Sequence, residues 1–313
     1  MILNNYHKFA FFGASVTKQN DSYADKLMIN LGKEYQKFGY GSMHLNDAGI
    51  CFVEEVVNYK PDICFIDWFS TANTNYGNDI SIYLDAILYK LLNNNIKPIF
   101  LLFPISEIVQ SRLEMYNNVK KYALDYNINC IDIYEQSLAD NIIVSDIIKD
   151  YVHTTVFGSE YYAGIILNFL NNFVLQLPDE PLHSNYNIVY PHKNKYVDII
   201  KTSINKTFSK LSVLVEDEVV GFYQTVGPHS GDVEIYKDSI LIEKQPVWDV
   251  WCYYERDTFK IQLKEPGEYM IKVVDCSRDR SKSKVQVDWS SFKKEIRIKD
   301  IYHISNIIIK DYE

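Results

Sequence analysis

The sequence lacks the features by which several classes of protein are recognised. Its five cysteines contain no C-x-x-C pair and stand at positions 51, 64, 130, 252 and 276. An odd, scattered set of this kind predicts free thiols in a reducing compartment rather than a disulfide framework. The common nucleotide-binding loops, G-x-x-x-x-G-K-[ST] and G-x-G-x-x-G, do not occur. No H-E-x-x-H or similar spacing exists among the seven histidines, so we expect neither a metal ion nor a cofactor.

Long apolar runs and clusters of basic residues are also missing. The apolar run near the amino terminus, Phe9 to Phe12, has four residues and neither a basic region before it nor a cleavage site after it. We therefore expect a cytoplasmic protein with no membrane partner. The net charge is -9, with 32 Lys and Arg against 41 Asp and Glu. Phosphate binding depends on clustered Lys and Arg, so this balance argues against a nucleic-acid partner.

The composition that remains is that of an ordinary globular protein with two domains. The chain has 313 residues, which exceeds the usual size of one domain. Of these residues 47% are hydrophobic and 23% charged, as in other globular proteins. Residues 9 to 173 alternate short apolar runs with amphipathic helical patterns, the first of which extends from Ala24 to Tyr35. This alternation predicts an α/β fold, a doubly wound parallel sheet with helices on both faces. The expected strands are Phe9 to Phe12, Ile63 to Trp68, Ile99 to Phe103 and Cys130 to Ile133.

A different pattern follows residue 174. The segment "LQLPDEPLHSNYNIVYP" contains three prolines and no helical period, which is typical of a linker. Beyond it, apolar residues alternate with polar ones, as in Tyr269, Ile271 and Val273. We expect an α/β domain over residues 1–176, and over residues 177–313 the linker followed by an antiparallel β-sandwich.

A serine stands at the end of the first apolar run. The run stops at Gly13-Ala14-Ser15. Gly and Ser are turn formers, and a serine at this point can cap a helix. Alternatively, Ser15 is a nucleophile at the carboxyl end of a strand, where open α/β sheets bind their ligands.

An acid and a histidine precede the last helix of the first domain. Asp150 and His153 are three residues apart, shortly before Gly158. At this spacing the carboxylate can accept a hydrogen bond from imidazole Nδ1 and leave Nε2 free as a base. The alternatives are a surface acid–histidine pair, or Asp150 as the cap of the following helix. In a doubly wound sheet this segment and Ser15 reach the same edge.

Together the two segments resemble a known family. "FGASVT" resembles block I of the SGNH (GDSL-like) hydrolases, and "DYVHTTVFGSEYYA" resembles their terminal Asp-x-x-His block. The resemblance covers residues 9 to 173. It implies a flavodoxin-like parallel sheet, no metal, and a catalytic triad of Ser15, His153 and Asp150.

The family completes its oxyanion hole with a glycine and an asparagine. "FGYGSMHLNDAG" contains Gly39, Gly41 and Gly49; we favour Gly41, because the lack of a side chain permits close approach. The competing interpretation is a loop around a short second strand. The resemblance assigns the oxyanion hole to Ser15, Gly41 and an asparagine that follows the next buried strand.

The asparagine block departs from the family pattern. In "PDICFIDWFSTAN", Phe69 and Thr71 fall at the places of the family glycine and asparagine, and Asn73 comes two residues late. We assign Asn73 as the third donor, with Ser70 or Thr71 as substitutes. Loss of one oxyanion donor can cost two to three orders of magnitude in rate.

The predicted function is that of a serine esterase that removes a short acyl group, expected to be acetyl, from a carbohydrate or glycoconjugate. Its partner would be a small-molecule or glycan ester. Two alternatives stay open: an acyltransferase that moves the acyl group onto a sugar hydroxyl, and a carbohydrate-binding protein with weakened catalysis. Two features of the second domain stand out: the aromatic residues around Trp248, and His229 on a loop bracketed by glycines. We favour the interpretation that they belong to a sandwich core with tight turns. The alternative is a surface that stacks on sugar rings. The sequence leaves the oligomeric state open.

Overall fold

The computed structural model divides the chain into two compact units, Met1–Tyr196 and Val197–Glu313. The expected domain boundary after residue 176 lies outside the described residues. The structure describes residues 5–41, 43–45, 49–70, 81–106, 110–172, 188–190, 195–197, 200–216, 219–228, 230–248, 255–263, 265–277, 295–303 and 307–312.

The first unit is built on a parallel sheet of five strands, in the order β2-β1-β3-β4-β5. The order reverses between β1 and β3, and open α/β sheets bind ligands beyond the carboxyl ends of their strands at such a point. The doubly wound, flavodoxin-like sheet is therefore confirmed. The strands are β1 Lys8–Gly13, β2 Glu34–Gly39, β3 Ile63–Ile66, β4 Lys97–Leu102 and β5 Asn129–Asp132.

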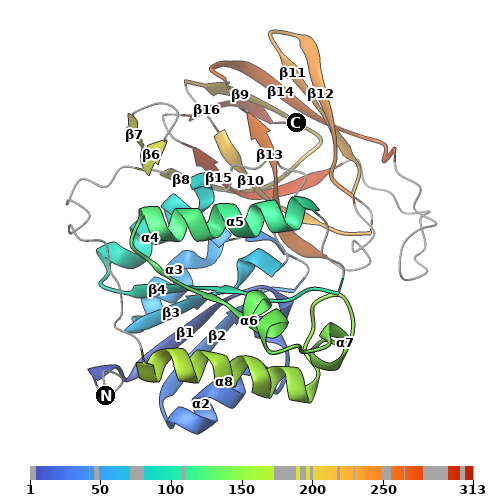
Figure 1. Ribbon diagram of the computed structural model, residues 1–313. Coiled ribbons are helices and arrows are strands. Elements are labelled where there is room, and N and C mark those ends of the chain that lie inside the picture. The colour runs from blue at the N-terminus through green and yellow to red at the C-terminus, as the bar shows by residue number, and fades with distance from the viewer. Residues whose placement is uncertain are drawn as a thin grey trace. The chain divides into compact units, whose positions relative to one another are not determined.

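Helices cover both faces of this sheet. Figure 1 shows α2 and α8 on one face and α3, α4 and α5 on the other. Phe9 and Phe11 of β1 pack against the first pair of helices, whereas Phe12 points the other way and meets Trp68 edge-on. The helices are α1 Ser15–Lys18, α2 Tyr23–Leu31, α3 Ile50–Tyr59, α4 Ser81–Asn93, α5 Gln110–Asp125, α6 Ile133–Ala139, α7 Val144–Ile147 and α8 Val156–Asn172, with a 3-10 turn, η3, at Trp68–Ser70.

The helix expected from Ala24 to Tyr35 is α2, and it is shorter than its apolar pattern predicted. α2 ends at Leu31, because Gly32 adopts a left-handed conformation with φ of 61° and its N–H bonds the carbonyl of Met28. Tyr35 therefore belongs to β2 and not to the helix. Within the described residues, no helix combines the length and the apolarity needed to cross a membrane.

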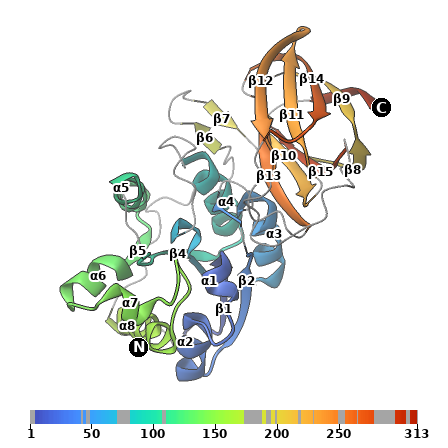
Figure 2. The ribbon, with the colours of Figure 1, turned by 90° about the vertical axis from the view of Figure 1, so that its right-hand side faces the viewer.

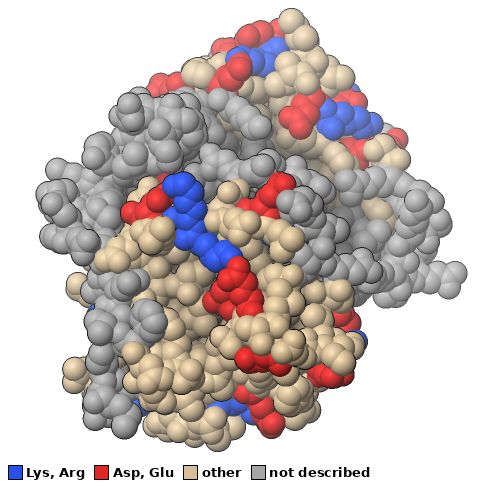
Figure 3. Space-filling view, viewed as in Figure 1, with Lys and Arg blue, Asp and Glu red and all other residues tan. Residues whose placement is uncertain are grey.

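Charges on the first unit are paired locally. On the face shown in Figure 3, acidic and basic side chains adjoin one another in small groups. Lys120 of α5, for example, lies 3.1 Å from Asp132 and 2.5 Å from Glu135. Exposed pairs of this kind add little to stability, but they neutralise each other's field.

The second unit consists of two antiparallel sheets with the strand orders β13-β10-β15-β8 and β12-β11-β14-β9-β16. Side chains of both sheets share one apolar core that includes Phe222, Ile271 and Trp248. The predicted β-sandwich is thus confirmed, and Trp248 is part of its core. His229 and residues 251–254 lie outside the described residues. The strands of the second unit are β8 Ile200–Phe208, β9 Lys210–Val215, β10 Val219–Val226, β11 Asp232–Lys237, β12 Ile240–Pro246, β13 Arg256–Leu263, β14 Gly267–Val274, β15 Ile296–His303 and β16 Ile307–Tyr312. Before them in the chain, β6 Ile188–Tyr190 of the first unit pairs with β7 Lys195–Val197 in a separate ribbon.

Candidate active site

Ser15 lies at the carboxyl edge of the parallel sheet, beside the reversal of strand order. β1 ends at Gly13 and α1 begins at Ser15, so only Ala14 separates strand from helix. Figure 2 shows α1 beside β1 and β2. Ala14 is buried and Ser15 is half-buried, so the turn is held in place while the serine is partly accessible.

A buried carboxylate lies directly against this turn. Asp67 follows β3, is fully buried, and accepts hydrogen bonds from the Ala14 N–H at 3.1 Å and the Thr17 hydroxyl at 2.5 Å. The Tyr23 hydroxyl lies 3.2 Å from the same carboxylate. Burial raises the pKa of Asp67 to about 7, against the opposing effect of these three hydrogen bonds. Sequence analysis missed this residue.

His153 and Asp150 form the predicted contact. The imidazole Nδ1 lies 3.0 and 2.9 Å from the two carboxylate oxygens of Asp150. A carboxylate in this position favours the tautomer with the proton on Nδ1, which leaves Nε2 as an acceptor. The His153 side chain is 34% exposed. The pair can therefore accept a proton from a group that approaches Nε2.

Asp150 also organises its own loop. One of its oxygens accepts hydrogen bonds from the backbone N–H groups of Val152 and His153, at 3.0 and 2.9 Å. Burial works to raise its pKa, but these bonds and the imidazole hold the pKa below its usual value, so the carboxylate is ionised at neutral pH. The first turn of α8 uses another acceptor, since the Thr155 hydroxyl accepts the N–H of Gly158 at 2.9 Å. Asp150 is therefore not the cap of that helix.

The loop around His153 is fixed by its backbone. Ile148 and Thr154 form an isolated antiparallel bridge, and the Lys149 N–H donates to the carbonyl of His153 at 2.9 Å. A Cβ on Gly158 would lie 1.9 Å from the carbonyl oxygen of Ile147, so only glycine fits beneath this loop. The histidine is thus presented from a rigid segment.

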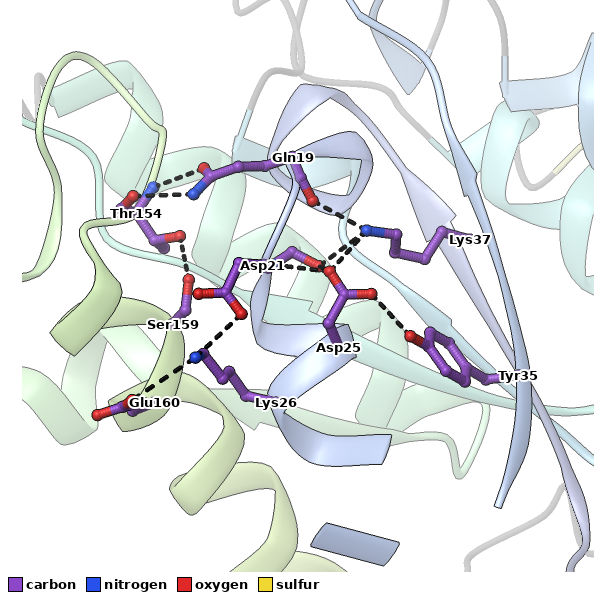
Figure 4. A network of polar contacts seen from close by, with 10 residues as sticks. Gln19, Asp21, Asp25, Lys26, Tyr35, Lys37, Thr154, Ser159 and Glu160 are labelled. Atoms are coloured by element: carbon purple, nitrogen blue, oxygen red, sulfur yellow. Dashed lines mark hydrogen bonds and ion pairs between the residues drawn. The ribbon is translucent and has the colours of Figure 1, made fainter. Parts of the chain in front are cut away.

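Gln19, at the end of α1, bonds Thr154, the residue after His153, as Figure 4 shows. Its Nε2 donates to the carbonyl of Thr154 at 2.9 Å, and its Oε1 accepts the Thr154 N–H at 3.1 Å. The Gln19 N–H bonds the carbonyl of Ser15 at 2.9 Å, one helical turn away. The residue after His153 therefore lies next to the helix that begins at Ser15. Nothing in the sequence pattern identified Gln19.

Lys37 continues this network to the edge strand β2. Its ammonium donates to the carbonyl of Gln19 at 2.9 Å and to Asp25 at 2.7 Å. Asp25 also accepts the Tyr35 hydroxyl at 2.9 Å. The ion pair is mostly shielded from solvent, so it holds the end of α1 against both β2 and α2.

The side chain of Ser15 makes no hydrogen bond within the described residues. Its Oγ is therefore available to a substrate, although no hydrogen bond joins Oγ to His153 Nε2 within the described residues. Catalytic hydrogen bonds are often long without substrate and tighten when it binds.

The predicted oxyanion donors other than Ser15 have different outcomes. Gly41 lies two residues past β2, where a Cβ would meet nothing within 4 Å. Its role as a donor therefore stays a prediction. At Gly39 a Cβ would lie 2.4 Å from the backbone nitrogen of Lys18, so this glycine lets α1 pack against β2. Asn73 and Thr71 lie outside the described residues, as does the side chain of Ser70. Phe69 is buried, and its carbonyl accepts a hydrogen bond from Arg112 at 2.9 Å.

Among the described residues, no group of three or more His, Cys, Asp and Glu is placed to hold a metal ion. Ser15 provides a hydroxyl and an N–H, and His153, on the loop that Gln19 joins to the helix of Ser15, provides an imidazole oriented by Asp150. Such a set can perform acyl transfer through a serine.

Neither a protein-family model nor a curated protein matches the sequence, but solved structures do. Two crystal structures of a two-domain esterase active on acetylated mannans, one of them with mannopentaose, match 98% and 96% of this chain over 92% and 91% of their own. Their TM-scores are 0.60 and 0.61, and their identities 14% and 13%. The chain has the fold of this two-domain esterase, which confirms both the α/β fold that the SGNH resemblance implied for residues 9–173 and the β-sandwich that the alternating pattern predicted after residue 174.

A shorter structure matches part of the chain. It is a member of the lipolytic protein G-D-S-L family from Veillonella parvula DSM 2008, covered over its full length by 53% of this chain at 14% identity and a TM-score of 0.44. Because a shared fold does not by itself fix a reaction, the chemistry has to be argued from the residues.

Proposed function

We propose that this protein is a serine esterase that removes acetyl groups from a carbohydrate. The proposal rests on one observation above all: the Asp150–His153 pair, whose Nδ1 contact is 2.9 Å, lies on a loop that Gln19 joins to the Ser15 helix. The loop that carries His153, an imidazole oriented by Asp150, therefore lies beside the helix that begins at the half-buried Ser15.

The first half of the reaction forms an acyl-enzyme. His153 Nε2 takes the proton of the Ser15 hydroxyl as Oγ attacks the ester carbonyl, and Asp150 stabilises the imidazolium that results. The Ser15 N–H is one donor for the developing oxyanion, and Gly41 is the proposed second. His153 then returns the proton to the leaving sugar oxygen as the C–O bond breaks.

The second half releases acetate. Water attacks the acetyl-serine while His153 accepts its proton, and the tetrahedral intermediate collapses to acetate and free Ser15 Oγ, which takes the proton back. Every step uses side chains and N–H groups of this chain alone. The third oxyanion donor is proposed to come from residues 70–73, with Asn73 as the first candidate.

Exposed aromatic side chains close to His153 in the sequence support a carbohydrate substrate. Tyr151 and Phe157 are 48% and 50% exposed, two residues before and four residues after His153. Exposed rings offer an apolar body on which the apolar face of a sugar can stack. The esterase that shares this fold acts on acetylated mannans, which makes acetylated mannan the first polymer to test.

The proposal is tested by hydrolysis of 4-nitrophenyl acetate and butyrate and by release of acetate from acetylated mannan. We expect wild type to prefer the acetate ester, and Ser15→Ala and His153→Ala to lose activity by a factor of roughly 10³ or more. Ser203→Ala and His7→Ala, in exposed positions, are matched controls with wild-type rates. Equal rates for wild type and Ser15→Ala on every substrate would contradict the proposal.

A further inference from the structure

Asp67 stands at the end of β3, against the turn that presents Ser15. Its own N–H donates to the carbonyl of Phe12 at 3.1 Å, so the β1–β3 pairing continues one residue past the strand. The carboxylate is fully buried and projects toward Gly13 and Ala14. It is placed against the turn by the sheet itself.

The two carboxylate oxygens hold the chain on both sides of Ser15. Oδ1 accepts the Ala14 N–H at 3.1 Å, and Oδ2 accepts the Thr17 hydroxyl at 2.5 Å. The residue before the serine and the residue two after it are therefore bound to one rigid group. This restricts rotation of the backbone at Ser15 and so fixes the direction of its Cα–Cβ bond.

Tyr23 of α2 seals the same cluster. Its hydroxyl lies 2.8 Å from the Thr17 hydroxyl and 3.2 Å from Asp67 Oδ2, and its side chain is fully buried. The Thr17 and Tyr23 hydroxyls both donate to Asp67 Oδ2 and lie within hydrogen-bond distance of each other, and such networks strengthen their members. Hence α1 and α2 are fixed to the same carboxylate.

Stability alone does not account for a carboxylate at this place. Burial raises the pKa of Asp67 to about 7, so the protein works against its ionised form. The hydrogen bonds from Ala14, Thr17 and Tyr23 lower the pKa again only in part, and the titratable groups beside the carboxylate include Tyr23 and the buried thiol of Cys64. Groups retained at such a cost are often tied to a functional site.

Asp62, at the other end of β3, provides a comparison. It also accepts backbone N–H groups of the β1 segment, from His7 at 2.7 Å and Lys8 at 3.0 Å. Both bonds lie toward the surface, at the amino edge of the sheet, away from Ser15. Asp62 and Asp67 thus anchor opposite ends of the same strand pair, and only one of them adjoins the proposed nucleophile.

We propose that Asp67 is a positioning residue for Ser15, which it holds in the attacking orientation through Ala14 and Thr17; this rests on the proposed role of Ser15 as nucleophile. The residue touches neither substrate nor the reacting atoms. Its effect falls on the rate of attack and leaves substrate binding unchanged.

The test compares Asp67→Ala and Asp67→Asn with wild type and with Asp62→Asn. Two quantities are measured for each full-length protein: kcat and KM on 4-nitrophenyl acetate, and the rate at which a fluorophosphonate probe labels Ser15, read by mass spectrometry. Thermal unfolding of each protein is recorded alongside. Thr17→Val, which removes one of the two contacts with little change in shape, covers the case in which Asp67→Ala does not fold.

We expect the loss in kcat and in labelling rate to grow with the number of Asp67 contacts that a variant removes. Asp67→Ala should lower kcat by roughly 100-fold and the labelling rate in parallel, with KM within about twofold. The amide of Asp67→Asn keeps an oxygen for the Ala14 N–H, so this variant should recover about tenfold of that loss, and Thr17→Val should fall near it. Asp62→Asn should match wild type in kcat and labelling even where its melting temperature falls.

Two results would overturn the proposal, and they have different consequences for the proposed esterase function. If Asp67→Ala, Asp67→Asn and Thr17→Val unfold at lower temperature but retain wild-type kcat and labelling, Asp67 is a structural residue only and the esterase proposal stands. If the probe does not label Ser15 of wild type, the proposed nucleophile fails and the positioning role fails with it.

Discussion

Gln19 and Thr154 are joined by two hydrogen bonds, from Gln19 Nε2 to the Thr154 carbonyl and from the Thr154 N–H to Gln19 Oε1. A side-chain amide here satisfies both backbone groups of a residue 135 positions away. The contact connects the helix of Ser15 to the loop of His153, so a single side chain helps to fix the position of one relative to the other.

Replacement of Gln19 should therefore disturb the reaction more than the fold. Gln19→Glu retains the acceptor but sets a second oxygen against the Thr154 carbonyl, and a lost bond with an unpaired acceptor costs about 1–3 kcal/mol. We expect kcat on 4-nitrophenyl acetate to fall roughly tenfold or more, with a smaller change in KM. Gln136→Glu, at an exposed glutamine that bonds Asp140 within one helix turn, is the matched control. Equal kcat for both variants would refute the linkage.

Gly13 and Asp67 compete for the same space. A Cβ on Gly13 would lie 1.2 Å from Asp67 Oδ1, and its three nearest atoms all belong to that side chain. Gly13→Ala alone should displace the carboxylate and lower the melting temperature by several degrees, with loss of activity. In an Asp67→Ala background the obstacle is gone, so adding Gly13→Ala should change stability little. A double-mutant cycle by urea unfolding measures this coupling, and additive losses would show that Gly13 is required for another reason.

Asp150→Asn tests the orientation of the imidazole. The amide oxygen of the variant can still accept the N–H groups of Val152 and His153, so the loop should fold as before. Its amide nitrogen would meet His153 Nδ1 and favour the tautomer with the proton on Nε2, which cannot act as a base. We expect kcat/KM to fall by roughly 10²–10⁴-fold with little change in melting temperature. Asp140→Asn, another loop carboxylate bonded by Tyr161, should retain wild-type kinetics, and equal kinetics for both variants would remove Asp150 from the triad.

The sequence predicted the buried strands better than the exposed one. Strands β1, β3 and β4 are mostly apolar because helices cover both faces of the sheet, and apolar runs marked each of them. Strand β5, at one edge of the sheet, was found through Cys130 and Ile131 although Asn129 and Asp132 are polar, and Ile133 begins α6 instead. Strand β2 was not among the expected strands, apart from the short second strand of the competing interpretation around Gly39, because it forms the other edge of the sheet and exposes Glu34 to Gln36, half of its residues. Without an apolar run it resembled the end of the preceding helix.

The same reasoning explains which parts of the site could be predicted. Asp150 and His153 are three residues apart, so their contact is encoded locally. The bonds of Gln19 to Thr154 and of Asp67 to Ala14 join segments 135 and 53 residues apart and exist only once the sheet has formed. For Asp67 there was one usable signal, a carboxylate directly after a wholly apolar strand, which is the same signal that pointed to Ser15.

The stability of the protein should depend on pH through Asp67. Burial raises its pKa from the ordinary value of 3.8 to about 7, so between these values the unfolded chain is ionised at this residue while the folded chain binds a proton. The folded state then binds more protons than the unfolded state, and the free energy of unfolding falls as pH rises. The loss at this one residue is on the order of 4 kcal/mol between the two pKa values. Above the folded-state pKa both states are ionised and the loss is complete.

Asp67→Asn removes this contribution and leaves the others. The free energy of unfolding, measured by urea at pH 5 and pH 8 in wild type and variant, contains the same contributions from all other groups, which cancel in the difference. We expect wild type to lose roughly 2 kcal/mol or more relative to Asp67→Asn as pH rises from 5 to 8. Asp62→Asn, at the other end of the same strand, is the matched control. Parallel pH profiles for wild type and Asp67→Asn would mean that Asp67 is ionised at both pH values, with its hydrogen bonds outweighing its burial.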